Sequence, residues 1–259
     1  MTENILLVSK EDGIATVTLN RPDKFNALSE ELLDQLLIEL GDIEQDTSTS
    51  VVVLAANGPA FCAGHDLRQM RSNHSASYYR ELFAKCTEMM QLITRLRQPV
   101  IAQVNGMATA AGCQLVATCD LAVAADSAQF GVSGINLGLF CSTPSVALTR
   151  NVARKRAFEM LVTGDFIDAT TAVDYGLINH SVSATQLEAT VMSKARKIAS
   201  KPAAALGVGK QLFYDQLPKS LPDAYALASE VMACNMLEAE TIEYVDAFLE
   251  KRPARPLQR

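Results

Sequence analysis

Two short stretches, about forty residues apart, combine residue types that can expose backbone N–H groups. The first is Phe61-Cys62-Ala63-Gly64-His65-Asp66-Leu67, and the second runs from Val104-Asn105-Gly106 to Ala110-Ala111-Gly112-Cys113-Gln114. Glycine admits backbone conformations that turn the following N–H outward. A strand that ends in small residues and starts a helix presents free N–H groups and the positive end of the helix dipole. Each stretch is therefore a candidate anion site.

Together, the two stretches predict an oxyanion hole. Two fixed N–H donors aimed at one oxygen stabilise the negative charge that it gains in a transition state, and one such donor is worth about 3–4 kcal/mol in acyl-transfer sites. A thioester oxygen that becomes an enolate needs such a pair. The competing interpretation is that both stretches are tight turns without a ligand, and either one alone would favour it. Their occurrence on successive strand-to-helix corners favours the site.

The elements that position these corners begin with a predicted hairpin. Ile5-Leu6-Leu7-Val8 and Ala15-Thr16-Val17-Thr18-Leu19 flank an Asp12-Gly13 turn. Ser29 is placed to cap a helix whose leucines share one face up to Gly41. The run 51–55 is fully apolar, as expected of a strand buried on both faces.

The pattern of strand, corner and helix then repeats. A helical stretch from about Tyr78 to Arg97 ends before Pro99, and 100–104 resumes the sheet before Asn105-Gly106. A third buried strand is expected at 121–125, followed by the short apolar piece Ala128-Gln129-Phe130. Thr143-Pro144 suits a helix cap and first position.

Beyond Pro144 the pattern is almost wholly helical. The expected helices cover 168–176, 186–200, 203–216, 221–235 and 238–251. We therefore expect an α/β core over residues 1–195 and a helical region over 196–259 that packs against its own core or a neighbouring subunit.

Composition excludes several functional classes. The chain has 259 residues, is 49% hydrophobic and carries a net charge of −6, which predicts an ordinary globular protein rather than a nucleic-acid binder. No uncharged apolar run reaches membrane-spanning length, and the beginning lacks a basic and apolar leader, so a cytoplasmic location is predicted. The six cysteines and three histidines show no metal-ligand spacing, so no metal is expected.

Several ordered motifs make the sequence similar to the crotonase superfamily, also called the enoyl-CoA hydratase/isomerase family. Besides the two corners, the motifs are Asn20-Arg21-Pro22 with Asn26-Ala27-Leu28, Cys119-Asp120-Leu121, Ala128-Gln129-Phe130-Gly131, and the terminal Ala247-Phe248-Leu249-Glu250-Lys251-Arg252-Pro253. The resemblance implies an α/β crotonase fold of the ClpP/crotonase-like type, a spiral of ββα units. It also implies a C-terminal helical region that mediates trimerisation, usually in a dimer of trimers.

The resemblance implies acyl-CoA thioester ligands and no separate cofactor, because coenzyme A is part of the substrate. The oxyanion donors correspond to the backbone N–H groups of His65 and Ala111. Contacts to coenzyme A would come from Lys24, Ala63, His65, Asp66, Leu67 and Arg68, with Lys251 reaching a neighbour's ligand.

Two positions depart from the family pattern. Hydratases of the family hold a water between two glutamates, which correspond here to Gln114 and Gly134. An amide has no acid or base function near neutral pH, and glycine has no side chain, so efficient hydration by that route is not expected. The aspartate of some isomerases and dehalogenases corresponds to the neighbourhood of Ser142, which leaves His65, Gln114, Cys141 and Ser142 as candidate catalytic residues.

Three functions stay open. The first is an acyl-CoA enzyme that stabilises an enolate with a proton source other than glutamate. The second is a decarboxylase of the methylmalonyl-CoA type, because loss of CO₂ creates an enolate without a base. The third is a catalytically silent acyl-CoA-binding protein. For His65 the backbone N–H alone competes with a side-chain role, for Cys141 a small buried thiol competes, and for Gln114 a structural hydrogen bond competes.

Overall fold

The computed structural model describes residues 4–255 and opens with an antiparallel hairpin. Strand β1 (Leu6–Glu11) pairs with β2 (Ile14–Leu19), and the turn residues Asp12 and Gly13 have φ angles of 50° and 74°. Positive φ at both positions is what a tight two-residue hairpin turn with the right twist requires. The predicted hairpin is confirmed.

The larger sheet has six strands in the order β1-β2-β3-β5-β7-β10. From β2 onward, β3 (Val51–Ala56), β5 (Val100–Val104), β7 (Leu121–Ala125) and β10 (His180–Val182) pair in parallel. The inner strands β3, β5 and β7 are almost wholly buried and mostly apolar because helices cover both faces of the sheet. Helix α8 (Leu187–Ala199) packs over Val51, Val53 and Ile101, whereas Val52 and Leu54 join the core that contains α1 (Glu30–Gln45) and α3 (Ala76–Arg95).

A smaller sheet of four strands runs beside the first. Its order is β4 (Ala60–Cys62), β6 (Met107–Thr109), β8 (Gln129–Gly131) and β9 (Ile167–Asp168). Of these strands the sequence predicts only the piece at 128–130, because two or three residues are too few to show alternation. The small sheet places the ends of β4 and β6 side by side, and both corners of the predicted oxyanion hole follow these ends.

The helices agree with the predicted ones in place, but several of their ends differ. Those predicted to end at 97, 176 and 251 end at 95, 174 and 249. Two other differences lie at the helices that follow Ser29 and Cys141. Helix α1 begins at its predicted cap, where Ser29 Oγ accepts from the Leu32 N–H at 3.3 Å, but it continues through Gly41 to Gln45 because Ile43 adds a further buried turn. Helix α5 (Ser142–Asn151) begins with Cys141 as its cap, earlier than Thr143. The other short helices are α2 (Leu67–Ser72), α4 (Ala111–Thr118), α6 (Arg154–Thr163), α7 (Ala169–Asp174) and the 3-10 turns Pro22–Lys24, Ser133–Leu137 and Ala184–Gln186.

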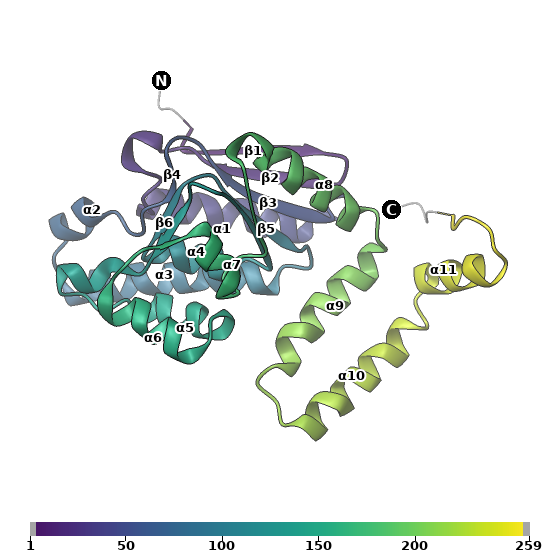
Figure 1. Cartoon of the computed structure of the whole chain (residues 1–259). Coiled ribbons are helices and arrows are strands. Elements are labelled where there is room, and N and C mark those ends of the chain that lie inside the picture. The colour runs from purple at the N-terminus through teal and green to yellow at the C-terminus, as the bar shows by residue number, and fades with distance from the viewer. Residues whose placement is uncertain (1–3, 256–259) are drawn as a thin grey trace.

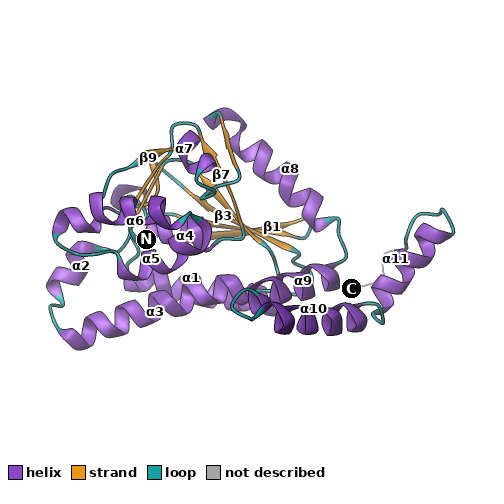
Figure 2. Ribbon diagram, turned by 60° about the horizontal axis from the view of Figure 1, so that its bottom comes forward, coloured by secondary structure: helices purple, strands orange, loops and turns teal. Residues whose placement is uncertain are grey.

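Three C-terminal helices extend away from the two sheets (Figure 1). They are α9 (Ala203–Gln216), α10 (Leu221–Asn235) and α11 (Ala239–Leu249). Helices α9 and α10 lie side by side, and α11 lies farthest from the sheets, as the turned view also shows (Figure 2). Within residues 4–255, no helix is long and apolar enough to cross a membrane. The division of the chain at residue 195 stays a prediction.

A buried ion pair attaches α9 to the core. Lys210 Nζ lies 2.6 Å from Asp120 Oδ2 and also donates to the carbonyl oxygens of Ile93 and Gln98, at 2.7 and 3.0 Å. The other carboxylate oxygen accepts from the Tyr214 hydroxyl at 2.8 Å. Burial lowers the pKa of Lys210, and Asp120 works in the opposite direction. Every proton of the ammonium group therefore has an acceptor, which is the condition for a buried charge.

We expect Lys210→Met to lower the free energy of unfolding by about 3 kcal/mol, because it leaves the partly buried Asp120 carboxylate without its cation. The exposed Lys219, just beyond α9, provides the matched control. Lys219→Met should change the unfolding free energy by less than about 0.5 kcal/mol. Urea denaturation measures both, and equal stabilities of the two variants would show that the ion pair does not hold α9 on the core.

Candidate functional site

The ends of the small sheet open into a cavity of about 280 Å³. Its wall is mostly apolar and comes from the two predicted corners, from α2 and α3, and from the segment that leads into α5. The lining residues are Ala63, His65, Leu67, Met70, Phe83, Ala110, Ala111, Ser133, Gly134, Leu137, Leu139, Phe140, Cys141, Ser142, Thr143 and Pro144. No aspartate or glutamate is among them.

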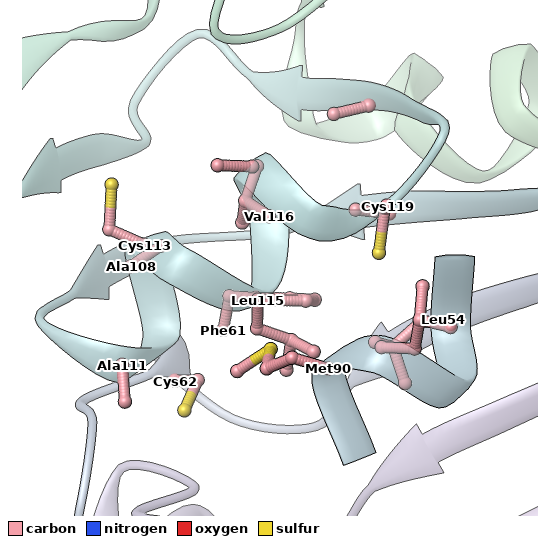
Figure 3. Packing of buried hydrophobic residues seen from close by; sticks show 14 of the residues in the cluster. Leu54, Phe61, Cys62, Met90, Ala108, Ala111, Cys113, Leu115, Val116 and Cys119 are labelled. Carbon is pink, nitrogen blue, oxygen red and sulfur yellow. The ribbon is translucent and has the colours of Figure 1, made fainter. Parts of the chain in front are cut away.

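The two corners pack against each other backbone to backbone. A methyl group on Gly64 would lie 3.0 Å from the Ala110 Cβ and 3.2 Å from the Ala111 nitrogen, and Gly64 has a φ of +89°. A methyl group on Gly112 would lie 2.0 Å from the Cys62 carbonyl oxygen. Figure 3 shows Cys62 and Ala111 side by side at this contact. Both glycines are therefore required by close approach, and Gly64 also by its left-handed conformation.

The backbone N–H groups of His65 and Ala111 are free to bind a ligand. Within residues 4–255, neither donates to another backbone group, and no side chain caps α4, of which Ala111 is the first residue. Hydrogen bonds from Leu28 N–H to the Gly64 carbonyl, at 2.8 Å, and from Asp66 N–H to the Leu28 carbonyl, at 3.1 Å, hold the first corner. The structure thus brings the two predicted donors to one cavity wall.

Ala110 holds a backbone conformation that alanine rarely adopts. Its φ and ψ are 50° and −120°, and its N–H donates to the Gly131 carbonyl at 2.9 Å. Such a conformation costs about 1–3 kcal/mol and persists only where the surroundings impose it. Strain at the residue that precedes Ala111 indicates that the direction of the next N–H is set by the fold and not by local preference.

Both ring nitrogens of His65 are buried, and the side chain is electrically neutral at pH 7. Burial lowers its pKa to about 4, although the Leu28 carbonyl works in the opposite direction. Neither ring nitrogen has a hydrogen-bond partner among the described residues. The ring packs edge-on against Phe83, with 5.4 Å between centroids. His65 is therefore not an acid at neutral pH, and its backbone N–H is the group that the geometry presents.

Of the other candidate catalytic residues, Cys141 and Ser142 line the cavity and Gln114 does not. Burial raises the pKa of the Cys141 thiol. Ser142 is exposed, and its hydroxyl donates to the Phe140 carbonyl at 3.3 Å. Gln114 is buried within α4, where its Oε1 has no partner among the described residues.

At Gly134, the second position that departs from the family pattern, the surrounding backbone leaves no space for a side chain. A methyl group on Gly134 would lie 2.5 Å from the Leu139 carbonyl oxygen and 2.8 Å from Cys141 Sγ. Leu139 N–H also donates to the Gly134 carbonyl at 3.0 Å. The segment after β8 therefore fills the space into which a side chain at position 134 would extend.

One polar pair in the cavity wall has no signal in the sequence. Ser133 Oγ lies 2.9 Å from Thr109 Oγ1, and Ser133 lines the cavity. The residues are 24 positions apart in sequence, and they meet because β6 and β8 are neighbours in the small sheet. Single serine and threonine residues in short strands and turns carry no pattern that would have identified them.

The residues expected to contact coenzyme A belong to the first corner or to a segment bonded to it, except Lys251. Ala63, His65 and Leu67 line the cavity, and Lys24 and Arg68 are exposed. The Phe25 carbonyl next to Lys24 accepts from Ala63 N–H at 3.0 Å. The sixth, Asp66, instead caps α2 and binds Arg21 Nη2 at 3.1 Å. Lys251 follows α11, a helix that lies far from α2 and α5 in one chain (Figures 1 and 2).

The sequence is similar to enoyl-CoA hydratase proteins over most of its length. The family model described as enoyl-CoA hydratase/isomerase matches residues 9–257. A mouse protein named enoyl-CoA hydratase domain-containing protein 3, mitochondrial, is 44% identical over 243 residues, covering 94% of this chain and 81% of that protein. The short-chain-enoyl-CoA hydratase of Clostridium acetobutylicum is 30% identical over 257 residues, covering 97% of each.

Solved structures are similar over nearly the whole fold. An enoyl-CoA hydratase of Mycobacterium smegmatis has a TM-score of 0.96 at 55% identity, covering 98% of this chain and 99% of that one. The human enoyl coenzyme A hydratase domain-containing protein 3 has a TM-score of 0.95 at 42% identity, covering 98% and 100%. These similarities confirm the predicted fold class. Because the mouse relative is named as mitochondrial, a cytoplasmic location for this chain stays a prediction.

Acid should destabilise the fold through His65. An unfolded histidine with a pKa of 6.5 takes up a proton as the pH falls, whereas His65 in the folded state stays neutral down to about 4. Its contribution to the unfolding free energy should therefore fall by roughly 2 kcal/mol between pH 7 and pH 4.5. Urea titrations at both values should show a smaller loss in His65→Gln than in the wild type. The exposed His74→Gln should behave as the wild type does, and a His65→Gln loss equal to that of the wild type would contradict the neutral state.

Proposed function

The chain belongs to the enoyl-CoA hydratase/isomerase family, and on that premise we propose that it binds an acyl-CoA thioester and stabilises its enolate. The thioester oxygen accepts hydrogen bonds from the backbone N–H groups of His65 and Ala111. The observation that carries the proposal is the contact between the two corners, which leaves two unbonded N–H groups on one wall of a largely apolar cavity. Fixed donors in a site that excludes water act strongly on a developing negative charge. Coenzyme A enters as part of the substrate, and no further cofactor is proposed.

The cavity wall carries no charged group at neutral pH. Its two ionisable side chains are those of His65, with a pKa of about 4, and Cys141, whose pKa burial raises. General acid or base catalysis is worth about 10²–10⁴-fold for each group. Without the two glutamates of the hydratases, and with no room for a side chain at Gly134, hydration of an enoyl-CoA is expected to be slow.

A second candidate is decarboxylation of a substrate of the methylmalonyl-CoA type, and the uncharged wall favours it. A substrate carboxylate that enters such a cavity leaves its water behind, and loss of CO₂ moves the charge to the thioester oxygen, where the N–H donors are. The electrons of the broken carbon–carbon bond form the enolate, so no base is required. If neither hydration nor decarboxylation occurs, the third candidate, a silent acyl-CoA-binding protein, applies.

We propose a homotrimer or a dimer of trimers, with the C-terminal helices as the contact. Helices α10 and α11 and the turn between them expose many large apolar side chains, including Met232, Leu237, Phe248 and Leu249, which are 69–82% exposed. A surface of this kind usually marks a protein interface. The assembly would also let Lys251 approach the ligand of a neighbouring subunit.

Gly64→Ala should abolish measurable acyl-CoA binding, because its methyl group displaces the Ala111 N–H and its positive φ adds strain. Gly13→Ala is the matched control, since Gly13 has a similar φ of +74° but its nearest neighbour, the Ser48 carbonyl oxygen, lies 3.5 Å away. The Gly13→Ala variant should lose stability but keep its affinity for acyl-CoA. Isothermal titration with butyryl-CoA tests both variants, and retained affinity in Gly64→Ala would remove the oxyanion assignment.

Wild-type protein should release CO₂ from methylmalonyl-CoA and hydrate crotonyl-CoA at least about 10²-fold more slowly than a hydratase with both glutamates. The His65→Pro variant, which lacks the donor N–H, should lose CO₂ release, while folding is checked by circular dichroism. Cys141→Ala should reduce CO₂ release if the thiol takes part. Crotonyl-CoA hydration within tenfold of that hydratase would contradict the chemical interpretation, whereas binding without any turnover would favour the silent protein.

A further inference from the structure

The proposed enolate needs a proton at its α-carbon, and the cavity wall offers few groups that could supply it. His65 is neutral with both ring nitrogens buried, and Cys141 lies against Gly134. Ser142 already directs its hydroxyl at the Phe140 carbonyl. No hydrogen bond among the described residues orients Thr143. One hydroxyl remains that is both in the wall and held in place, that of Ser133.

The small sheet places Ser133 close to the oxyanion corner. Thr109 pairs with Gly131 across β6 and β8, and Ala110 N–H donates to the Gly131 carbonyl at 2.9 Å. The segment 131–133 therefore runs alongside 109–111, which ends at the Ala111 donor. Both Ser133 and Ala111 line the same cavity.

Thr109 orients the Ser133 hydroxyl. The two oxygens are 2.9 Å apart, and Thr109 is only 8% exposed. When the Thr109 O–H donates to Ser133 Oγ, the proton of Ser133 is free to point into the cavity. A serine oxygen that accepts one hydrogen bond is also a better donor, because successive hydrogen bonds polarise one another.

From this arrangement we propose that Ser133, oriented by Thr109, is the catalytic residue that protonates the α-carbon of the thioester enolate. The inference rests on the proposed function. The electron pair of the enolate α-carbon forms the new C–H bond with the Ser133 proton, and the thioester carbonyl is restored. The electrons of the O–H bond stay on Ser133 Oγ, where the Thr109 hydrogen bond stabilises the alkoxide. Water then returns a proton to Ser133 and leaves as hydroxide, so no oxidation or reduction takes place.

The direction of proton delivery provides a readout that a merely structural role would not change. With methylmalonyl-CoA in D₂O, the wild type should give propionyl-CoA with one deuterium at C2 in a single configuration, because the donor is fixed on one face. Ser133→Ala should lower turnover about 10²-fold or more and give both configurations, because solvent protonates either face. Butyryl-CoA affinity should be unchanged. Ser133→Thr keeps the hydroxyl and should restore the stereochemistry.

Two further variants separate the pair from general effects. Thr109→Val removes the orienting hydroxyl and should reduce stereoselectivity while Ser133 is retained. Ser145→Ala is the control, since Ser145 bonds the Ser142 carbonyl at 2.7 Å on α5 and lines no part of the cavity, and it should behave as the wild type does.

The outcomes distinguish the two proposals. If the wild type neither releases CO₂ from methylmalonyl-CoA nor exchanges the α-hydrogen of propionyl-CoA with D₂O, the enolate function fails and this inference fails with it. If the wild type shows either reaction and Ser133→Ala retains its rate and stereochemistry, the proposed function stands and the role of Ser133 is overturned.

Discussion

The site depends on one contact, the backbone packing of the β4 corner against the β6 corner. A methyl group added to Gly112 would lie 2.0 Å from the Cys62 carbonyl oxygen. The two backbone segments are therefore too close together for any side chain at position 112. A methyl group on Gly64 would lie 3.0 Å from the Ala110 Cβ and 3.2 Å from the Ala111 nitrogen. Because neither corner can move without a collision, the N–H groups of His65 and Ala111 keep a fixed separation. Strain at Ala110 is the local cost of this geometry.

Around these donors the protein has placed apolar groups and neutral polar groups. Burial holds the pKa of His65 at about 4 and raises that of Cys141, so the strongest electrostatic feature of the wall at neutral pH is the pair of N–H dipoles. Fixed dipoles act strongly where water is excluded. This combination suits a reaction in which charge arises on the thioester oxygen without prior removal of a proton by the protein. It also leaves neutral hydroxyls, such as the pair formed by Ser133 and Thr109, as the proton carriers that we propose.

The C-terminal helices are attached to the core through polar contacts of α9 and leave much of their apolar surface uncovered. Helix α9 is attached through the fully bonded ammonium group of Lys210, whereas α10 and α11 carry apolar side chains that one chain leaves uncovered. An ion pair with every hydrogen bond satisfied fixes a single docking geometry for α9. The exposed helices beyond it are the surface that the proposed assembly would cover.

From the sequence alone, the hairpin, the long strands, nearly all long helices and the family could be predicted, because each rests on local periodicity or on contiguous motifs. The two corners were also visible, since glycine and small residues mark sharp turns wherever they occur. What needed the tertiary structure was every feature that joins distant segments. The short strands of the small sheet are too brief to show a pattern, yet they bring Ser133 to Thr109 and close the space at Gly134. Burial, and with it the neutral state of His65, arises only when the whole chain packs around the ring.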